Sequence, residues 1–319
     1  MALGEFELID RYFRRELRRA VLGIGDDCAL LQPAPGMQLA TSTDMLVEGR
    51  HFVSTVPPER LGHKALAVNL SDLAACGARP VAFTLALAMP RADADWLAGF
   101  SRGLLALADA EGCELVGGDT TQGPLNICIT VFGEVAPGRA LLRSGARAGD
   151  DLYVSGTVGD ARLALEVFRA GLVLDGAAFA QVREALERPQ PRVALGQALG
   201  GIASSAIDVS DGLLGDLRHV LRRSSVGACV EVDTLPRSAV LAAQPPAMQR
   251  RCTLSGGDDY ELLFTAPPAA ADAVRAAARS AGVPVTRIGR IEAAPGLRLV
   301  DAQGQAVVDS FVSFDHFKA

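Results

Sequence analysis

Six short clusters of aspartate, each set among Gly, Ser or Thr, are the residues of this chain best suited to chemistry. The clusters are Gly25-Asp26-Asp27, Thr41-Ser42-Thr43-Asp44, Ser71-Asp72, Gly117-Gly118-Asp119-Thr120, Asp208-Val209-Ser210-Asp211-Gly212 and Gly256-Gly257-Asp258-Asp259. Carboxylates among small residues suit hard divalent cations, which prefer oxygen ligands. If the clusters converge in space, they form a site for several metal ions, and such a site indicates phosphate chemistry.

Taken singly, each cluster has a plainer interpretation, because Gly, Asp and Ser are also preferred in tight turns and at helix N-termini. Asp72 differs, since the pattern places it inside a helix with Asn69 and Ser71. Three weak helix formers together indicate a constraint other than helix stability. Two carboxylates about 4 Å apart repel by roughly 4 kcal/mol at an effective dielectric of 20. The clusters are therefore either scattered or neutralised by cations, and the pattern alone leaves both open.

The usual nucleotide-binding loops are missing from the sequence. Lys64 and Lys318 are the only lysines and neither follows a glycine, which excludes a GxxxxGK[ST] loop. A GxGxxG loop starting at Gly23 and Gly25 fails because Cys28 stands where the third glycine would be. A bound nucleotide would therefore be held mainly through metals and arginine.

Length and composition favour a globular protein of two domains. The chain has 319 residues, 49% of them hydrophobic and 21% charged. Its net charge of −6 argues against a nucleic-acid partner, and its longest apolar run, near Val81–Met89, is too short to span a membrane. No secretory signal is visible, and the six cysteines show no CxxC or zinc spacing, so a cytoplasmic location with buried thiols is expected.

Hydrophobic periodicity predicts alternating strands and helices in two α/β domains joined near residues 136–148. In the first half, strands are expected at 38–43, 81–89, 114–116 and 125–135, with helices at 61–76 and 93–111. In the second half, strands are expected at 152–155, 207–209, 260–265 and 285–291, with helices ending near 170, starting near 211 and covering 269–281. Phe13 and Leu17, with arginines between them, also predict an amphipathic surface helix over 11–19.

In addition, runs along the whole chain, in order, resemble the thiamine-monophosphate kinase family. They are Gly4-Glu5-Phe6, Gly23-Ile24-Gly25-Asp26-Asp27-Cys28-Ala29, Ser42-Thr43-Asp44, His51-Phe52, the segment from Lys64 to Ala75, Gly117-Gly118-Asp119-Thr120-Thr121, Arg143-Ser144-Gly145-Ala146, Ser210-Asp211-Gly212-Leu213 and Leu254-Ser255-Gly256-Gly257. The family belongs to a wider superfamily with aminoimidazole ribonucleotide synthetase and selenophosphate synthetase.

The resemblance implies an α/β (α+β) protein with two domains. Residues 1–137 would form an N-terminal domain that binds ATP and Mg²⁺ and pairs in a homodimer through a shared β-barrel, and residues 138–319 a C-terminal α/β domain. The implied reaction is the phosphorylation of thiamine monophosphate to thiamine diphosphate by ATP. Several Mg²⁺ ions would assist direct in-line transfer, and no residue would act as an acid or base.

The resemblance also implies roles for single residues. The metal ligands would be Asp27, Ser42, Thr43, Asp44, Asp72, Asp119, Asp208 and Asp211, with Asp72 and Asp208 the most critical. Nucleotide contacts would come from Gly118, Asp119, Arg143 and Ser210. Contacts with thiamine monophosphate would come from His51, Asp258 and Phe311. The family commonly has Glu in place of Asp258 and Trp in place of Phe311; Phe keeps a face for stacking but loses an N–H donor.

Two other functions are compatible with the same clusters. One is another ATP-using enzyme of the superfamily, similar to aminoimidazole ribonucleotide synthetase, which a panel of substrates would separate from a thiamine-monophosphate kinase. The other is a divalent-cation-binding protein without catalysis, which would bind metal but show no affinity for ATP.

Overall fold

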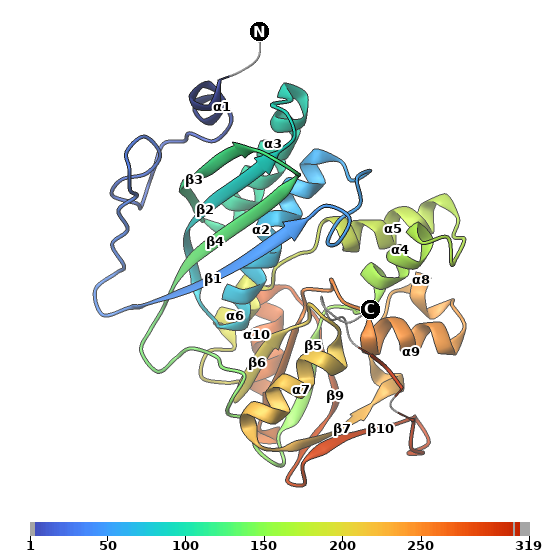
Figure 1. The fold of residues 1–319 in the computed structure, drawn as a ribbon. Coiled ribbons are helices and arrows are strands. Elements are labelled where there is room, and N and C mark those ends of the chain that lie inside the picture. Colours follow the sequence, from blue (N-terminus) through green and yellow to red (C-terminus); the bar gives the residue numbers. More distant parts are fainter. Residues whose placement is uncertain (1–3, 309, 313–319) are drawn as a thin grey trace. The chain divides into compact units, whose positions relative to one another are not determined.

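The computed structural model of the chain describes residues 4–308 and 310–312, which divide into two compact units (Figure 1). The N-terminal unit consists of the residues up to 73 together with 78–138, and the C-terminal unit of residues 74–77 and those from 139 onwards. In the described part of the chain, no helix is both long enough and apolar enough to cross a membrane.

A four-stranded mixed sheet forms the centre of the N-terminal unit. Its elements are α1 (Glu5–Tyr12), β1 (Gln38–Val47), α2 (Pro58–Ala75), β2 (Arg79–Met89), α3 (Ala94–Glu111), β3 (Glu114–Gln122) and β4 (Asn126–Val135). The strand order is β1-β4-β2-β3, with β2 and β3 parallel and the other pairs antiparallel. Helices α2 and α3 lie on one face of the sheet (Figure 1), where Leu66, Leu70, Phe83 and Phe100 are fully buried.

The C-terminal unit is built on a six-stranded mixed sheet in the order β10-β7-β9-β5-β8-β6. Its strands are β5 (Asp151–Ser155), β6 (Ser205–Asp208), β7 (Gly227–Glu231), β8 (Leu262–Ala266), β9 (Val285–Glu292) and β10 (Gly296–Val300). Its helices are α4 (Asp160–Phe168), α5 (Gly176–Glu187), α6 (Val193–Ala198), α7 (Leu213–Ser224), η1 (Val232–Thr234), α8 (Ala239–Ala242), α9 (Pro246–Ser255), η2 (Pro268–Ala270) and α10 (Ala271–Ala281). Leu213 and Leu217 of α7 pack with Leu152 and Val154 of β5 in one buried core.

Helix limits follow the expected signals where a capping residue is present. Helix α3 begins after Asp93, whose carboxylate accepts a hydrogen bond from the Trp96 N–H (3.1 Å), and ends at Gly112, which is left-handed with φ 62°. Helix α2 carries Asp72 in its interior, as the pattern predicts.

The prediction of a helix over residues 11–19 is wrong. Helix α1 ends at Tyr12, and the chain then runs without regular structure. The carboxylate of Glu114 accepts hydrogen bonds from the main-chain N–H groups of Arg18, Arg19 and Ala20 (2.8–3.2 Å). A partner distant in sequence thus satisfies amides that a helix would otherwise have satisfied, and periodicity carries no signal of it.

Candidate functional site

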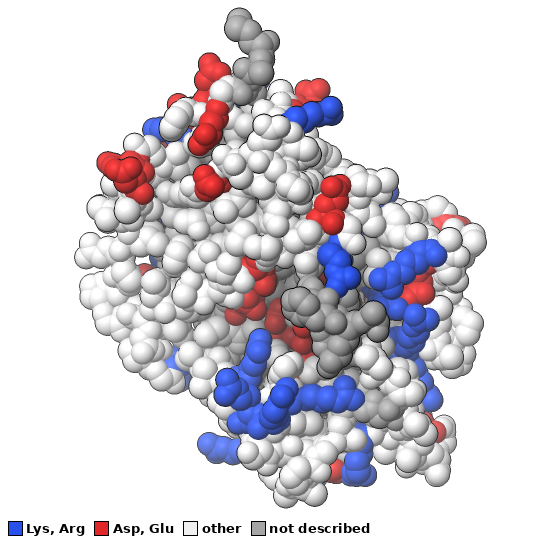
Figure 2. Space-filling model, in the orientation of Figure 1, with Lys and Arg blue, Asp and Glu red and all other residues white. Residues whose placement is uncertain are grey.

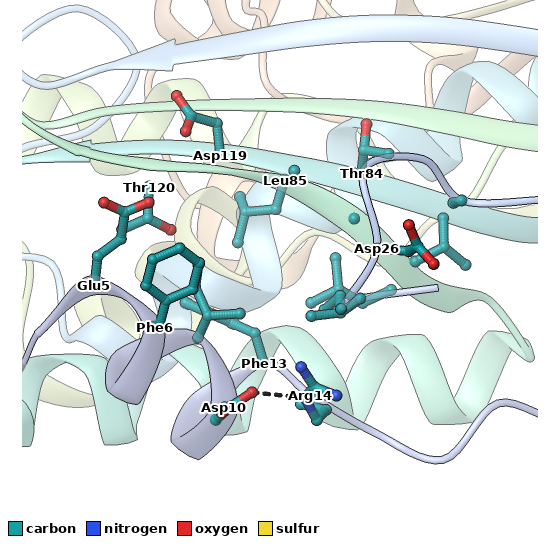
Figure 3. Close-up of a pocket in the computed structure, with 18 of the residues that line it drawn as sticks. Glu5, Phe6, Asp10, Phe13, Arg14, Asp26, Thr84, Leu85, Asp119 and Thr120 are labelled. Carbon is teal, nitrogen blue, oxygen red and sulfur yellow. Dashed lines mark hydrogen bonds and ion pairs between the residues drawn. The ribbon is translucent and has the colours of Figure 1, made fainter. Parts of the chain in front are cut away.

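The N-terminal unit contains a cavity of about 680 Å³ between α1 and strands β2 and β3 (Figure 3). One wall is formed by α1 and the residues after it, and the opposite wall by Thr84 and Leu85 of β2 and 117–120 of β3. The turn with Gly25, Asp26 and Asp27 completes the lining. The cavity therefore brings together Asp27, Gly118 and Asp119, three of the residues predicted to bind metal or nucleotide.

The lining combines an apolar part with an acidic part. Phe6 stands on α1, and Figure 3 shows its ring between that helix and the strands that carry Leu85 and Thr120. Asp26 accepts a hydrogen bond from the main-chain N–H of Asp27 (2.9 Å). A cavity of this size, lined by both apolar and charged side chains, has room for a small ligand.

The Gly117-Gly118-Asp119 run forms part of a strand, although the sequence pattern suggested a turn. Strand β3 continues to Gln122, and Asp119 is paired with Ala86 in parallel register. Gly118 has φ 147°, and a Cβ atom there would lie 1.8 Å from the carbonyl oxygen of Leu85. Only glycine can therefore occupy this position, and the close approach of the strands sets the place of Asp119 on the cavity wall.

A second group of predicted residues joins β1 to α2. The Ser42 hydroxyl donates a hydrogen bond to the Asp72 carboxylate (2.5 Å). The Asn69 side chain accepts one from the Asp44 main-chain N–H (2.9 Å) and donates one to the Ala65 carbonyl (3.0 Å). The two bonds to β1 explain why α2 carries Asn69 and Asp72 in its interior.

The side chain of Thr43 is separated from Ser42. Strand β1 alternates between half-buried and exposed positions, and Ser42 and Asp44 lie on the half-buried side. Thr43 lies on the exposed side, where its hydroxyl is 2.8 Å from that of Thr130 on β4. Strand β1 also continues through Asp44 to Val47, four residues beyond the predicted end at Thr43.

His51 lies in the segment between β1 and α2 and is held at two points. Its Nδ1 atom accepts a hydrogen bond from the Val47 N–H (2.9 Å), and its carbonyl accepts one from Nζ of Lys64 (3.2 Å). Lys64 is only 2% exposed. Because Nδ1 is an acceptor, the neutral ring carries its proton on Nε2.

In the C-terminal unit, the predicted metal ligands lie where β6 meets α7. Asp208 is the last residue of β6, and Asp211 follows shortly before the helix begins at Leu213. Neither Ser210 nor Asp211 caps the helix; instead the buried Asp216 accepts hydrogen bonds from both of their main-chain N–H groups (3.1 and 3.2 Å). Burial, followed by the charges of Asp208 and Asp211, raises the pKa of Asp216 to about 8.

The loop that carries Asp258 runs beside this junction. The main-chain N–H of Asp258 donates to the Ser210 carbonyl (2.9 Å), and that of Tyr260 donates to the Val209 carbonyl (2.8 Å). A Cβ atom on Gly257 would lie 2.4 Å from the Ser210 oxygen, so the two segments contact each other through their backbones. Both Asp258 and Tyr260 adopt left-handed conformations, which cost about 1–3 kcal/mol each for residues other than glycine.

Two further predicted residues lie elsewhere in the C-terminal unit. Arg143 is exposed, and its carbonyl accepts a hydrogen bond from the hydroxyl of Ser224 at the end of α7 (3.3 Å). Burial, followed by the charges of Arg222 and Arg143, lowers the pKa of His219 on the same helix. On the face shown in Figure 2, basic side chains gather over α7.

Phe311 is half-buried and packs against the main core of the C-terminal unit.

The predicted residues therefore form local groups. Within residues 4–308 and 310–312, no three or more His, Cys, Asp or Glu side chains gather in a way that could hold an ion. Sequence reasoning missed the α1 side of the cavity, although the Gly4-Glu5-Phe6 run pointed to it, and it missed Asp216. In the sequence, Asp216 is only an acidic residue in the first turn of a helix that follows a glycine. Many helices begin with such a residue for reasons unrelated to a functional site.

Comparisons with known proteins agree with this architecture. The chain matches the family models "AIR synthase related protein, N-terminal domain" over residues 25–135 and "AIR synthase related protein, C-terminal domain" over residues 147–302. It is 47% identical to the thiamine-monophosphate kinase of Salmonella typhimurium over 325 residues, which cover 99% of both chains.

Its fold is similar to that of two solved structures. One is the crystal structure of thiamine-monophosphate kinase from Stenotrophomonas maltophilia K279a, with a TM-score of 0.87 and 47% identity over 96% of this chain and 99% of that chain. The other is described as AaThiL complexed with AMPPCP and TMP, with a TM-score of 0.78 and 30% identity over 98% of this chain and 97% of that chain. The chain belongs to the thiamine-monophosphate kinase family.

Proposed function

We propose that this chain transfers a phosphoryl group from ATP to thiamine monophosphate and so forms thiamine diphosphate. The observation that carries the proposal is the 47% identity to a thiamine-monophosphate kinase over 99% of both chains, which includes both structural units. A relative of the same fold is described as a complex with AMPPCP, an ATP analogue, and TMP.

The cavity of the N-terminal unit is our proposed site for ATP. Its volume of about 680 Å³ is sufficient for a nucleotide, and the Phe6 ring offers an aromatic face against which a base can stack. Gly118 and Asp119 on the opposite wall would contact the phosphates, in part through main-chain N–H groups. Arg143 and Ser210, both in the C-terminal unit, are the other two residues that we propose as nucleotide contacts. The basic surface over α7 supports this assignment on a chain whose net charge is −6 (Figure 2).

The donor set fits Mg²⁺. All the proposed ligands supply oxygen, and Mg²⁺ usually takes one or two carboxylates together with water and substrate phosphates. Small groups of carboxylates therefore suit Mg²⁺ better than a site in which the protein supplies every ligand. Asp27, Asp119, Ser42, Asp44, Asp72, Asp208 and Asp211 would hold the ions through their side chains, and Thr43 through its carbonyl. Bound Mg²⁺ would neutralise charge between the two phosphate groups and align them for in-line transfer.

The chain's own residues then need only position the reactants. The attacking group is a phosphate oxygen that is already anionic at neutral pH, so no general base is required. His51, Asp258 and Phe311 would bind thiamine monophosphate, with the Phe311 ring against its aromatic rings. The main-chain bonds of His51 to Val47 and of Asp258 to Ser210 support such a role, because they fix the backbone that carries each contact.

We also propose that the active form is a cytoplasmic homodimer that pairs through the N-terminal sheets. The outward side of β1 exposes Leu39 and Met45, and this supports a sheet face that is covered in an assembly. All six cysteines, each within the described residues, are free thiols, which supports a reducing compartment. The expectation that all of them are buried is wrong, because only Cys113 and Cys252 are buried. A solution mass of twice 33.3 kDa is the expected result.

Product analysis tests the proposed reaction directly. Purified protein with ATP, Mg²⁺ and thiamine monophosphate should give ADP and thiamine diphosphate in equal amounts. Calorimetry without the second substrate should show ATP binding that depends on Mg²⁺. Absence of thiamine diphosphate at saturating substrates would contradict the proposal.

A further inference from the structure

The loop over 256–260, between α9 and β8, has a strained backbone conformation at two residues that are not glycine. Asp258 has φ 65° and Tyr260 has φ 51°, in a region that favours glycine. On one side the loop is fixed by the hydrogen bonds from Asp258 and Tyr260 to the carbonyls of Ser210 and Val209. The hydroxyl of Tyr260 also donates to the Asp258 carboxylate (3.1 Å). The position of that carboxylate therefore depends on how the whole loop is held.

Asp259, between these two residues, fixes the loop on its other side. Its Oδ1 atom accepts a hydrogen bond from the main-chain N–H of Gly159 (2.8 Å), the residue immediately before α4. Its Oδ2 atom is the only buried side-chain nitrogen or oxygen in the described residues without a hydrogen-bond partner. A buried polar atom without a partner is costly, and its presence in a native structure calls for an explanation.

The surroundings of Asp259 favour a neutral carboxyl group. Burial, which the hydrogen bond from Gly159 only partly opposes, raises its pKa well above the usual range, and the charges of Glu261, Asp160 and Asp258 raise it further. A neutral carboxyl group still accepts the bond from Gly159. An amide of the same shape can do the same, so asparagine should replace Asp259 with little loss.

We propose that Asp259 is a positioning residue of the thiamine-monophosphate site: its carboxyl group ties the loop over 256–260 to the start of α4 and thereby places the carboxylate of Asp258. This inference rests on the proposed contact between Asp258 and the substrate. Without the bond to Gly159, the strained residues on either side of Asp259 would lose their tether to the start of α4, while the bonds to Val209 and Ser210 remained. The loop would then relax toward negative φ values, and Asp258 would lose its fixed place.

Steady-state kinetics of three variants test the proposal. Asp259→Ala should raise the KM for thiamine monophosphate about tenfold, the effect expected for one lost buried hydrogen bond, and leave the KM for ATP within about twofold. Asp259→Asn should stay within about threefold of the wild type for both substrates, because it keeps the acceptor. Asp160→Asn is the matched control: Asp160 is also buried at the start of α4, but its carboxylate accepts from the hydroxyl of Ser238 (2.6 Å). This control should leave both KM values unchanged.

A double variant separates positioning from general damage. If Asp259 acts through Asp258, adding Asp259→Ala to Asp258→Ala should change the KM for thiamine monophosphate by less than about twofold. Full additivity of the two effects would overturn the proposal, as would an Asp259→Asn variant as impaired as Asp259→Ala.

Amide hydrogen exchange gives a readout that does not need activity. Asp259→Ala should speed exchange of the Asp258 and Tyr260 amides about tenfold, whereas Asp259→Asn and Asp160→Asn should not. Unchanged exchange in Asp259→Ala would refute the tether. If the wild type made no thiamine diphosphate, the proposed function would fail, but the exchange experiment would still decide whether Asp259 holds the loop.

Discussion

The Ser42 hydroxyl of β1 donates a 2.5 Å hydrogen bond to the Asp72 carboxylate in the interior of α2. Next to this bond, the Asp44 main-chain N–H donates to the side chain of Asn69 on the same helix. A strand and a helix are thus joined by polar groups where apolar packing would be expected. Asn69, Ser71 and Asp72 are weak helix formers, so they lower the stability of α2. The bond from Ser42 fixes the orientation of the Asp72 carboxylate.

We predict that Asp72→Asn lowers kcat/KM by more than about 100-fold, beyond the effect usual for residues that only orient a metal ligand. Ser42→Ala, which removes the orienting hydroxyl, should cost about 10- to 100-fold. Both variants should unfold within about 1 kcal/mol of the wild type, since neither empties the apolar core. Kinetics as a function of Mg²⁺ concentration, with denaturant unfolding as the control, checks both effects. Near-normal turnover of Asp72→Asn would refute its assigned role.

Gly118 and Gly117 offer a matched pair on one strand. In Gly118→Ala the new Cβ would lie 1.8 Å from the Leu85 carbonyl oxygen at φ 147°, whereas in Gly117→Ala the nearest atom would be 3.9 Å away. We expect Gly118→Ala to lower the free energy of unfolding by at least about 2 kcal/mol and to abolish ATP binding. Gly117→Ala should cost less than about 1 kcal/mol. Equal stability of the two variants in denaturant titrations would contradict the close approach of β2 and β3.

Phe6 should contribute to ATP affinity but not to folding. Its side chain is 79% exposed, yet it lines the cavity on the side of α1 (Figure 3). Phe6→Ala should raise the KM for ATP about tenfold, because base stacking on an aromatic ring contributes about 1–3 kcal/mol. Phe6→Tyr keeps the ring and should stay near the wild-type value. If Phe6→Ala leaves the KM for ATP unchanged, the base lies elsewhere.

The pKa of Asp259 predicts how stability depends on pH. The folded state keeps this carboxyl group protonated because burial raises its pKa, while the unfolded chain releases the proton near pH 4. The stability that the neutral carboxyl provides is therefore complete below about pH 4 and is lost as the pH rises toward the raised pKa, by up to about 1.4 kcal/mol per pH unit. Asp259→Asn cannot ionise, so its free energy of unfolding should fall less steeply between pH 5 and 8. Parallel curves for the two proteins in denaturant titrations would contradict the raised pKa.

Local signals in the sequence were sufficient for the elements whose ends carry their own capping residues. Asp93 and Gly112 delimit α3 as expected. The weak helix formers of α2 indicated a constraint other than helix stability, and the bond from Ser42 to Asp72 is such a constraint. Such signals work because the residues that define the element are close in sequence.

Other features depend on partners far along the chain. The segment after Tyr12 is not helical because Glu114 satisfies its amides, and β3 extends through Gly118 because the backbone approaches Leu85. Strands β7 and β10, which were not predicted, are short and pair with each other in parallel across some 70 residues of sequence. The roles of Asp216 and Asp259 likewise arise from burial and contact, which periodicity does not encode.

The proposed reaction can be tested by measuring ADP and thiamine diphosphate over time after purified protein is mixed with ATP, Mg²⁺ and thiamine monophosphate. A parallel panel should replace thiamine monophosphate with the substrate of aminoimidazole ribonucleotide synthetase. We predict that ADP and thiamine diphosphate appear in a one-to-one ratio, that the chelator EDTA stops the reaction, and that the alternative substrate gives no turnover. ADP formation without thiamine diphosphate, or turnover only with the alternative substrate, would contradict the account.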